Sequence, residues 1–458
     1  MTYNHAFMTG AVLAAALSAC SSDGLDEVDE SVGVSVDALN GQLKKGKRLF
    51  EEALPHTNGR SCADCHAAED HMALSPASVE ARFQADPSDP LFHALDADDP
   101  GAATLTFDHL RQKGLVRVTL TLAANLDVID ENGDVVTNAD RTLVVWRGVP
   151  TIENVALTGP FLSDGRAGSL AQQVAGALQA HSQITHHPSA ATIDGIVAYE
   201  ETVFSSPSVA AIFAAVSSGQ PPPDPDPEFA PDSSEAAGKA IFQMACAACH
   251  GGASGDQITN RAAADETFVA LAPDGSVETS VLPDGTIVAI PLTGHTNGNF
   301  LNLGISASAY RRQVPPELGG IADPTALPLP HYRLRFYTDA TRTQQLIDLP
   351  PPPPLLGPNA IPQAFTVDPG RAVISGDPAD FEAFDIPQLR GIAHTAPYFH
   401  DNSRSTLGAV VGTYSRSILP RIPALGLPAV VPAAVAGQAP ESLTATQKTQ
   451  LIAYLNTI

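Results

Sequence analysis

The chain has 458 residues, with 25 Lys and Arg against 50 Asp and Glu, which gives a formal net charge of −25. This length predicts roughly two to three domains, and a hydrophobic content of 44% excludes a disordered acidic chain. The negative charge argues against a nucleic-acid partner, because phosphate binding needs clustered Lys and Arg.

The N-terminus is predicted to be an export signal. A short apolar stretch, 6–19, ends in Leu-Ser-Ala-Cys at Cys20, a pattern that resembles the lipobox of bacterial lipoproteins. We therefore expect a lipoprotein-type signal over 1–20 and an acidic tether over 21–39, with Cys20 carrying the lipid. The alternative is an ordinary cleaved signal with an incidental cysteine. Ser21 favours the outer membrane of a Gram-negative envelope, so the expected location is the periplasm.

Two Cys-x-x-Cys-His motifs account for the other four cysteines, Cys62 and Cys65 before His66, and Cys246 and Cys249 before His250. Cysteines at i and i+3 of a helical turn share one face and can form thioethers with two haem vinyl groups, and the histidine can then bind the iron. A zinc site or a redox dithiol is the alternative, but a zinc site of this type needs four ligands close together. The motifs predict two covalent haem c groups, with His66 and His250 as proximal ligands.

A repeat links the segments downstream of the two motifs. From Pro150 to Pro387 the offset is 237 residues, and the same offset joins Thr158 to Thr395 and Asp164 to Asp401. We expect a tandem duplication. Its parts are an N-terminal domain over 40–216, a Pro-rich linker over 217–232, and a C-terminal domain over 233–458 with an insertion at about 268–365.

The insertions are predicted to be rich in β-strands. Segments 116–122 and 142–146 alternate enough to pair, with a turn at 131–134 between them, and 276–291 suggests a second hairpin. The expected fold is mainly α: two tandem cytochrome c-like haem domains with β-hairpin and Pro-rich loop insertions.

Three motifs of the second half point to a family: Asp-Pro-Gly-Arg at 368–371, Phe-Asp-Ile-Pro-Gln-Leu-Arg at 384–390 and Thr-Ala-Pro-Tyr-Phe-His-Asp at 395–401. They resemble the C-terminal half of bacterial dihaem cytochrome c peroxidases, whose superfamily includes MauG, the enzyme that matures methylamine dehydrogenase. In the first half, 149–154 and Asp-Gly-Arg at 164–166 resemble the matching N-terminal signature.

The resemblance implies that hydrogen peroxide reacts at the N-terminal haem and that the C-terminal haem relays electrons from a small donor protein of cytochrome or cupredoxin type. It also implies a calcium ion between the domains, for which no ligands can be matched. Arg166 is expected to contact a haem propionate. Trp146 is either an electron conduit between the haems or a core residue.

The sixth haem ligands depart from the peroxidase pattern. The peroxidases place a methionine fourteen residues after the position of His400, and here that residue is Tyr414. Tyrosine at this place resembles MauG, where it ligates the second haem; the alternative is a half-buried helix aromatic.

The distal acid of the family corresponds to Gln183, which cannot move a proton between peroxide oxygens. His181, two residues away, is expected to take the place of this acid or to ligate the iron itself. The alternative is that it only packs against a helix.

The sequence therefore predicts an exported peroxidase-like oxidoreductase. The alternatives are a MauG-like oxidase acting on a protein or peptide partner, and a pure electron-transfer dihaem lipoprotein.

Overall fold

The computed structural model describes residues 36–251, 268–269, 279–281, 287–289, 291–292, 300–314, 323, 326–350, 365–419 and 441–458. The predicted signal, Cys20 and most of the predicted tether lie outside these residues, so their predictions are not tested by the structure. None of the helices in the described ranges is both long enough and apolar enough to span a membrane.

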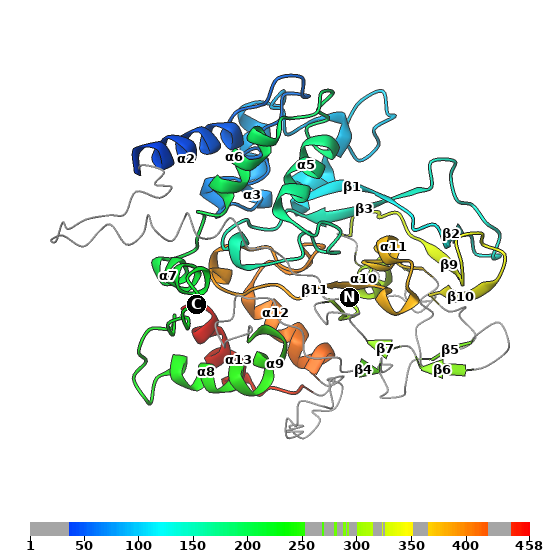
Figure 1. Cartoon of the computed structure of the whole chain (residues 1–458). Helices are drawn as coiled ribbons and strands as arrows, with labels where there is room; N and C mark the ends of the chain where they lie inside the picture. The colour runs from blue at the N-terminus through cyan, green and yellow to red at the C-terminus, as the bar shows by residue number, and fades with distance from the viewer. Residues whose placement is uncertain are drawn as a thin grey trace.

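Most helices of the first half lie in the upper part of Figure 1, and the last of them, at 207–217, lies lower in this view, near the C-terminus. Most of them begin at a serine whose side chain accepts a hydrogen bond from the N–H three residues later, the usual N-cap. They are α2 (Val36–Glu51), α3 (Pro76–Ala85), α4 (Asp108–Lys113), α5 (Leu170–Ala180), α6 (Ala190–Glu200) and α7 (Pro207–Ser217), with short 3-10 turns at Ala68–Asp70, Ala94–Asp96 and Val155–Leu157.

The second-half helices next to the second motif and at the C-terminal end of the chain lie in the lower part of Figure 1, whereas the short helices at 305–311 and 372–375 lie higher, among the strands. Helix α13 starts with a complete capping box formed by Thr444 and Gln447. The helices are α8 (Ser234–Ala245), α9 (Ala247–His250), α10 (Ile305–Arg311), α11 (Ala372–Ser375), α12 (Leu407–Thr413) and α13 (Ala445–Leu455), with a π-helical turn η9 at Tyr414–Ile418 and 3-10 turns at Pro378–Asp380 and Ile392–His394.

The same helix crossing occurs in both halves and depends on a glycine. In the first half α2 crosses α6 at Gly46, where an added Cβ would lie 2.1 Å from the carbonyl oxygen of Gly195. In the second half α8 crosses α13 at Gly238, where an added Cβ would lie 2.0 Å from the carbonyl oxygen of Gln450. Only glycine permits this approach, and it brings the helix that precedes each motif against a later helix of the same half.

Aromatic rings reinforce both crossings. The rings of Phe50 and Tyr199 lie 5.1 Å apart in the first half, and those of Phe242 and Tyr454 lie 5.5 Å apart in the second. Phe50, Phe242 and Tyr454 are fully buried. The matching G-K-x-x-F segments therefore build matching helix pairs.

The strands form small antiparallel sheets beside the helices. The predicted pairing of 116–122 with 142–146 is confirmed, since Val116 pairs with Arg147 and Thr121 with Thr142. The predicted second hairpin is also present. The pairs are β1 (Leu115–Thr121) with β3 (Thr142–Gly148), β5 (Thr279–Val281) with β6 (Ile287–Ala289), β4 (Phe268–Val269) with β7 (Pro291–Leu292), and β8 (Phe300–Asn302) with β11 (Ala383–Asp385).

One sheet joins the insertions of the two halves, which the sequence did not suggest. Strand β2 (Leu126–Ile129) pairs with β9 (Arg333–Tyr337), and β9 pairs with β10 (Gln345–Leu349). The core beneath this sheet and the β1–β3 pair contains residues from both halves, such as Leu126 and Phe336. The two insertions therefore fold as one unit.

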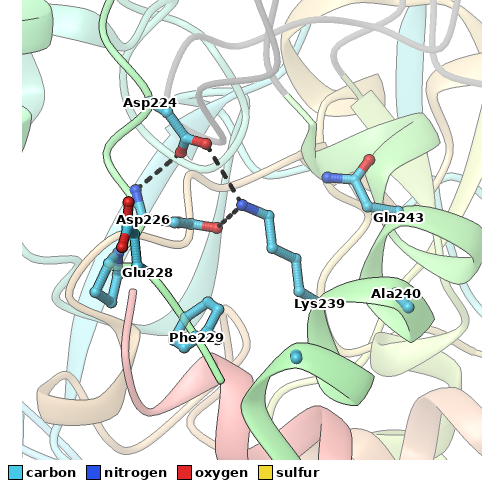
Figure 2. A pocket seen from close by; sticks show the side chains of 9 residues that line it. Asp224, Asp226, Glu228, Phe229, Lys239, Ala240 and Gln243 are labelled. Carbon is cyan, nitrogen blue, oxygen red and sulfur yellow. Dashed lines mark hydrogen bonds and ion pairs between the residues drawn. The ribbon is translucent and has the colours of Figure 1, made fainter. Parts of the chain in front are cut away.

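The Pro-rich linker is held against the second half by Asp226. Its carboxylate lies 2.8 Å from Lys239 Nζ and 2.6 Å from Arg390 Nη2, and it accepts a 2.8 Å hydrogen bond from the Tyr454 hydroxyl. Figure 2 shows Lys239 extending from α8 between Asp224 and Asp226. The linker is thus fastened to α8 and α13.

The repeated segments adopt the same backbone conformation at the offset of 237 residues. Asn154 and Gly391 both have a left-handed φ and both begin a 3-10 turn. The bridge between Phe161 and Ala167 recurs between Tyr398 and Arg404. Helices α5 and α12 then begin at equivalent residues, capped by Ser169 and Thr406 respectively.

Candidate haem sites

Each Cys-x-x-Cys-His motif forms one helical turn. The N–H of His66 donates to the carbonyl of Cys62 at 3.0 Å, and the N–H of His250 donates to the carbonyl of Cys246 at 2.9 Å. Burial raises the pKa of Cys65 and of Cys246 to about 12, so both are neutral thiols at neutral pH when no metal is bound. A structural zinc site needs four ligands close together, and in the described residues no three His, Cys, Asp or Glu side chains are grouped in that way, so the turns fit thioether attachment of haem better than a zinc site.

Both motif histidines are oriented through Nδ1. His66 Nδ1 lies 3.0 Å from the carbonyl oxygen of Met72, and His250 Nδ1 lies 3.0 Å from that of Pro387. With Nδ1 donating to a carbonyl, Nε2 remains the lone-pair nitrogen, which is the arrangement of an iron-ligating histidine. Burial lowers the pKa of both imidazoles, which favours the neutral form that binds metal.

The second site has an oxygen ligand candidate in place. The Tyr414 hydroxyl lies 3.3 Å from His250 Nε2, the nitrogen that would bind the iron of a haem held here. Tyr414 is the first residue of the π-helical turn that follows α12, and its ring stacks on Phe399 with centroids 6.4 Å apart. Such π-turns are frequent at functional sites because they displace one side chain from the helical register. Burial raises the pKa of the Tyr414 phenol.

The first site differs at the equivalent position. Because α5 and α12 begin at equivalent residues, the counterpart of Tyr414 at the 237-residue offset is Ala177. The methyl group of alanine cannot ligate a metal. One helical turn later, His181 caps the C-terminal end of α5. Burial lowers the pKa of its imidazole. The charge of Asp96 opposes this shift, and the charges of Arg60 and Arg166 add to it.

Gln183 lies in the loop after α5 and is exposed. Its Oε1 accepts a 3.3 Å hydrogen bond from Asn58 Nδ2, and its backbone has a φ of 49°. His181 is therefore the less exposed residue of this pair.

Two arginines, one of them fully buried, brace the first haem turn. Arg60, two residues before Cys62, forms a 2.6 Å ion pair with Asp96 in which both side chains are 1% exposed. Arg82 donates to the carbonyl and to the carboxylate of Asp64, which lies inside the motif, at 2.7 and 2.8 Å. In the second motif alanines stand between the cysteines, so this turn has no internal charge of its own.

An ionic network joins the two halves. Arg147 forms a bidentate pair with Asp368 at 2.7 and 2.9 Å and contacts Asp164 at 2.6 Å. Arg166 donates to the same Asp164 carboxylate at 2.7 Å, which leaves the other N–H groups of its partly exposed guanidinium as candidates for a propionate. Arg371 donates to the Asp164 carbonyl at 2.9 Å. The Asp-Gly-Arg and Asp-Pro-Gly-Arg motifs thus meet at this point.

Trp146 lies next to Arg147 on β3 but packs elsewhere. Its ring stacks on His109 of α4, with centroids 4.2 Å apart. The aromatic contact at the junction is instead between Phe384 and His400, stacked at 3.7 Å, with the Arg147 guanidinium 5.6 Å from the Phe384 ring.

Sequence reasoning missed three features of these sites: Ala177, Arg147 and the carbonyl of Pro387 that orients His250. The internal repeat contained the signal for Ala177, since counting 237 residues back from Tyr414 reaches it. Nothing in the sequence marked Arg147, because its role depends on carboxylates 17 and 221 residues away.

Comparison with known proteins bears on the family. A family model described as di-haem cytochrome c peroxidase matches residues 41–241, and one described as cytochrome c oxidase, cbb3-type, subunit III matches residues 233–286. The resemblance to dihaem cytochrome c peroxidases is confirmed. The second match adds that the chain contains a cytochrome c-like domain.

Similar proteins are related only in part. A cytochrome-c peroxidase of Denitromonas iodatirespirans, IdrP2, is 45% identical over 49 residues, which span 11% of this chain and 13% of that protein. The solved structure of a MauG-like protein associated with microbial copper homeostasis has 16% identity and a TM-score of 0.38, with 94% of this chain and 90% of that chain covered. The solved structure of the diheme peroxidase BthA of Burkholderia thailandensis has 16% identity and a TM-score of 0.38, with 91% of this chain and 85% of that chain covered. Both structural likenesses are weak.

Proposed function

We propose that this protein is an exported dihaem c-type oxidoreductase that reduces hydrogen peroxide at the first haem with electrons relayed by the second. Bound haem iron supplies the redox chemistry at each site. The observation that supports this division most strongly is the pairing of Tyr414 with Ala177 in the repeat. The Tyr414 hydroxyl lies 3.3 Å from His250 Nε2, whereas the methyl group of Ala177 offers no ligand at the equivalent position, which would leave the first iron open to a small molecule such as peroxide.

His66 and His250 hold the proximal positions in this proposal. Hydrogen bonds from their Nδ1 atoms to backbone carbonyls fix the rings and increase the basicity of Nε2. Tyr414 excludes water and substrate from the opposite side of the second site, which suits a centre that only passes electrons.

His181 is the proposed acid–base group of the first site. Reduction of peroxide needs a proton moved from one oxygen to the other. The lowered pKa keeps the imidazole neutral at pH 7, so it can accept a proton and return it. Arg166, held by Asp164, is placed to stabilise negative charge such as a propionate.

A MauG-like oxidase acting on a protein or peptide partner is the second candidate, and Tyr414 favours it, because the resemblance associates a tyrosine ligand with that activity. A pure electron-transfer dihaem protein is the third, and it requires His181 to be an iron ligand. The export signal, the lipid anchor at Cys20, the small electron-donor protein and the calcium ion remain part of the proposal. In the described part of the chain, no three His, Cys, Asp or Glu side chains are grouped to hold a metal ion.

The deciding experiment exchanges the distal residue of the first site. Ala177→Tyr should place a phenol over the first haem, remove any high-spin ferric signal from its electron paramagnetic resonance (EPR) spectrum, and slow peroxide consumption with a reduced cytochrome at least tenfold. Ala180→Tyr is the matched control, because residue 180 is exposed on the same helix. If the wild-type protein shows two low-spin irons and does not react with peroxide after half-reduction, the peroxidase proposal is wrong.

A further inference from the structure

Two surface loops beside the first haem site are fastened to each other. The N–H of Asn58 donates to the Ser182 carbonyl at 2.9 Å, and its side-chain Nδ2 donates to the His181 carbonyl at 3.0 Å. The N–H of Thr185 donates to the His56 carbonyl at 3.0 Å. These hydrogen bonds join the loop before the first motif to the loop after α5, so side chains that project from the two loops have a defined relative position.

Two exposed imidazoles meet across this junction. The rings of His56 and His186 have centroids 4.1 Å apart and planes tilted by 35°. His186 Nδ1 lies 3.2 Å from the Thr185 hydroxyl, which orients the ring and leaves Nε2 as its second nitrogen. His56 has a φ of 65°, a left-handed conformation that histidine adopts more readily than most residues.

This separation suits two ligands of one metal ion. A metal–nitrogen bond of about 2.0–2.1 Å puts each ring centroid roughly 3.1 Å from the metal, so two imidazoles would have centroids about 4.5 Å apart at a right angle and about 5 Å apart at a tetrahedral angle. The observed distance is 4.1 Å, so the two exposed side chains would move apart by roughly 0.4–1 Å to hold one ion. The tilt between the planes also differs from the flat overlap expected of simple stacking.

We infer that His56 and His186 bind a divalent transition-metal ion of the class that prefers imidazole, such as Zn²⁺ or Cu²⁺, with water completing the coordination. Neutral imidazole suits these ions, whereas Mg²⁺ and Ca²⁺ prefer carboxylate and carbonyl oxygens. The net charge of −25 raises the local concentration of any cation. The bound ion would clamp the loop that carries His181 and Gln183 to the loop that leads into the first haem motif. This site does not depend on the peroxidase proposal.

The test is zinc binding to the oxidised holoprotein. A chelator first removes loosely bound metal, and the protein is then dialysed against Zn²⁺ in the presence of excess Mg²⁺. We expect the wild type to bind one Zn²⁺ per chain more than the double variant His56→Asn, His186→Ala. Each single substitution should lower the affinity of that site for Zn²⁺ at least tenfold. Asparagine is chosen at 56 because it tolerates the left-handed φ. His331→Ala is the matched control, since this exposed histidine packs against Tyr310 and Phe365 rather than another imidazole.

Three readouts keep the result interpretable. The haem absorption spectrum and the melting temperature without metal should be unchanged in every variant, which shows that each one folds. Added Zn²⁺ should raise the melting temperature of the wild type and of the control, but not of the double variant. If the double variant binds as much Zn²⁺ as the wild type, or if the wild type binds none in the presence of Mg²⁺, the rings form only a surface contact and the inference is wrong.

Discussion

The hydroxyl oxygen of Tyr414 lies 3.3 Å from Nε2 of His250, the histidine of the second haem motif. The position of Tyr414 in the repeat corresponds to Ala177. The two candidate haem sites therefore share a histidine whose Nδ1 contacts a backbone carbonyl and differ at this repeat position, and the predictions below follow from that difference and from the network between the halves.

Removing the phenol oxygen should change the coordination of the second iron. In Tyr414→Phe the ring can still stack on Phe399, but the oxygen ligand is lost. We expect a low-spin signal to be replaced by a high-spin one in EPR, with a change in the haem absorption bands. Tyr414→Met should raise the reduction potential of this haem, because methionine is the ligand typical of high-potential haem c. Tyr310→Phe, elsewhere in the chain, is the control. An unchanged spectrum in Tyr414→Phe would exclude ligation.

Replacing His181 should separate its two proposed roles. If it transfers the proton, His181→Gln lowers the rate of reaction with peroxide by about 10²–10⁴-fold and leaves the iron spectra unchanged. Because the pKa of His181 is lowered, the neutral form persists below pH 6.5, so the wild-type rate should fall only at more acidic pH and the variant should lack that step. His187→Gln, which is exposed, is the control. A new high-spin iron in His181→Gln would instead identify it as a ligand.

Arg147 should be a major determinant of stability. It joins Asp164 of the first half to Asp368 of the second, and all three side chains are nearly fully buried. Arg147→Ala leaves buried carboxylates without this partner, which costs about 3–5 kcal/mol in comparable pairs. Chemical denaturation measures the loss. Lys47→Ala removes the exposed pair with Glu51 and should change stability by less than about 0.5 kcal/mol. A loss below about 1 kcal/mol for Arg147→Ala would contradict the assignment.

Glu200 should make the protein less stable as pH rises. Burial raises the pKa of this carboxyl to about 8, with the charge of Glu201 adding to it, whereas the unfolded value is 4.5. Between those values the folded state binds more protons than the unfolded state, so the free energy of unfolding falls as pH rises from 4.5 through about 8. Glu200→Gln should therefore melt at a higher temperature than the wild type at pH 9, with a much smaller difference at pH 5.

The control for this pH effect is Glu52→Gln, because Glu52 is exposed on the surface near the end of α2. Its melting temperature should follow that of the wild type at both pH values. Equal melting temperatures of Glu200→Gln and wild type at pH 9 would mean that Glu200 is solvated in the folded protein.

The sequence by itself determined the cofactor class and the repeat. The spacing of cysteine and histidine within each motif is a local property of one helical turn, so it can be read without a fold. The internal offset predicted equivalent segments, and the structure shows the same turns and capped helices in both. The family resemblance is confirmed, and the family match over 41–241 includes the first of these motifs.

The tertiary structure decided which side chains face one another. The pairing of β2 with β9 joins segments some 200 residues apart, and strand periodicity does not specify a partner. Trp146 and Arg147 are adjacent in sequence, yet one stacks on His109 and the other joins the two halves, because alternate residues of a strand point to opposite faces. The approach of Tyr414 to His250 depends likewise on packing between α12 and the haem turn. Local patterns predict local turns, but contacts across the chain require the fold.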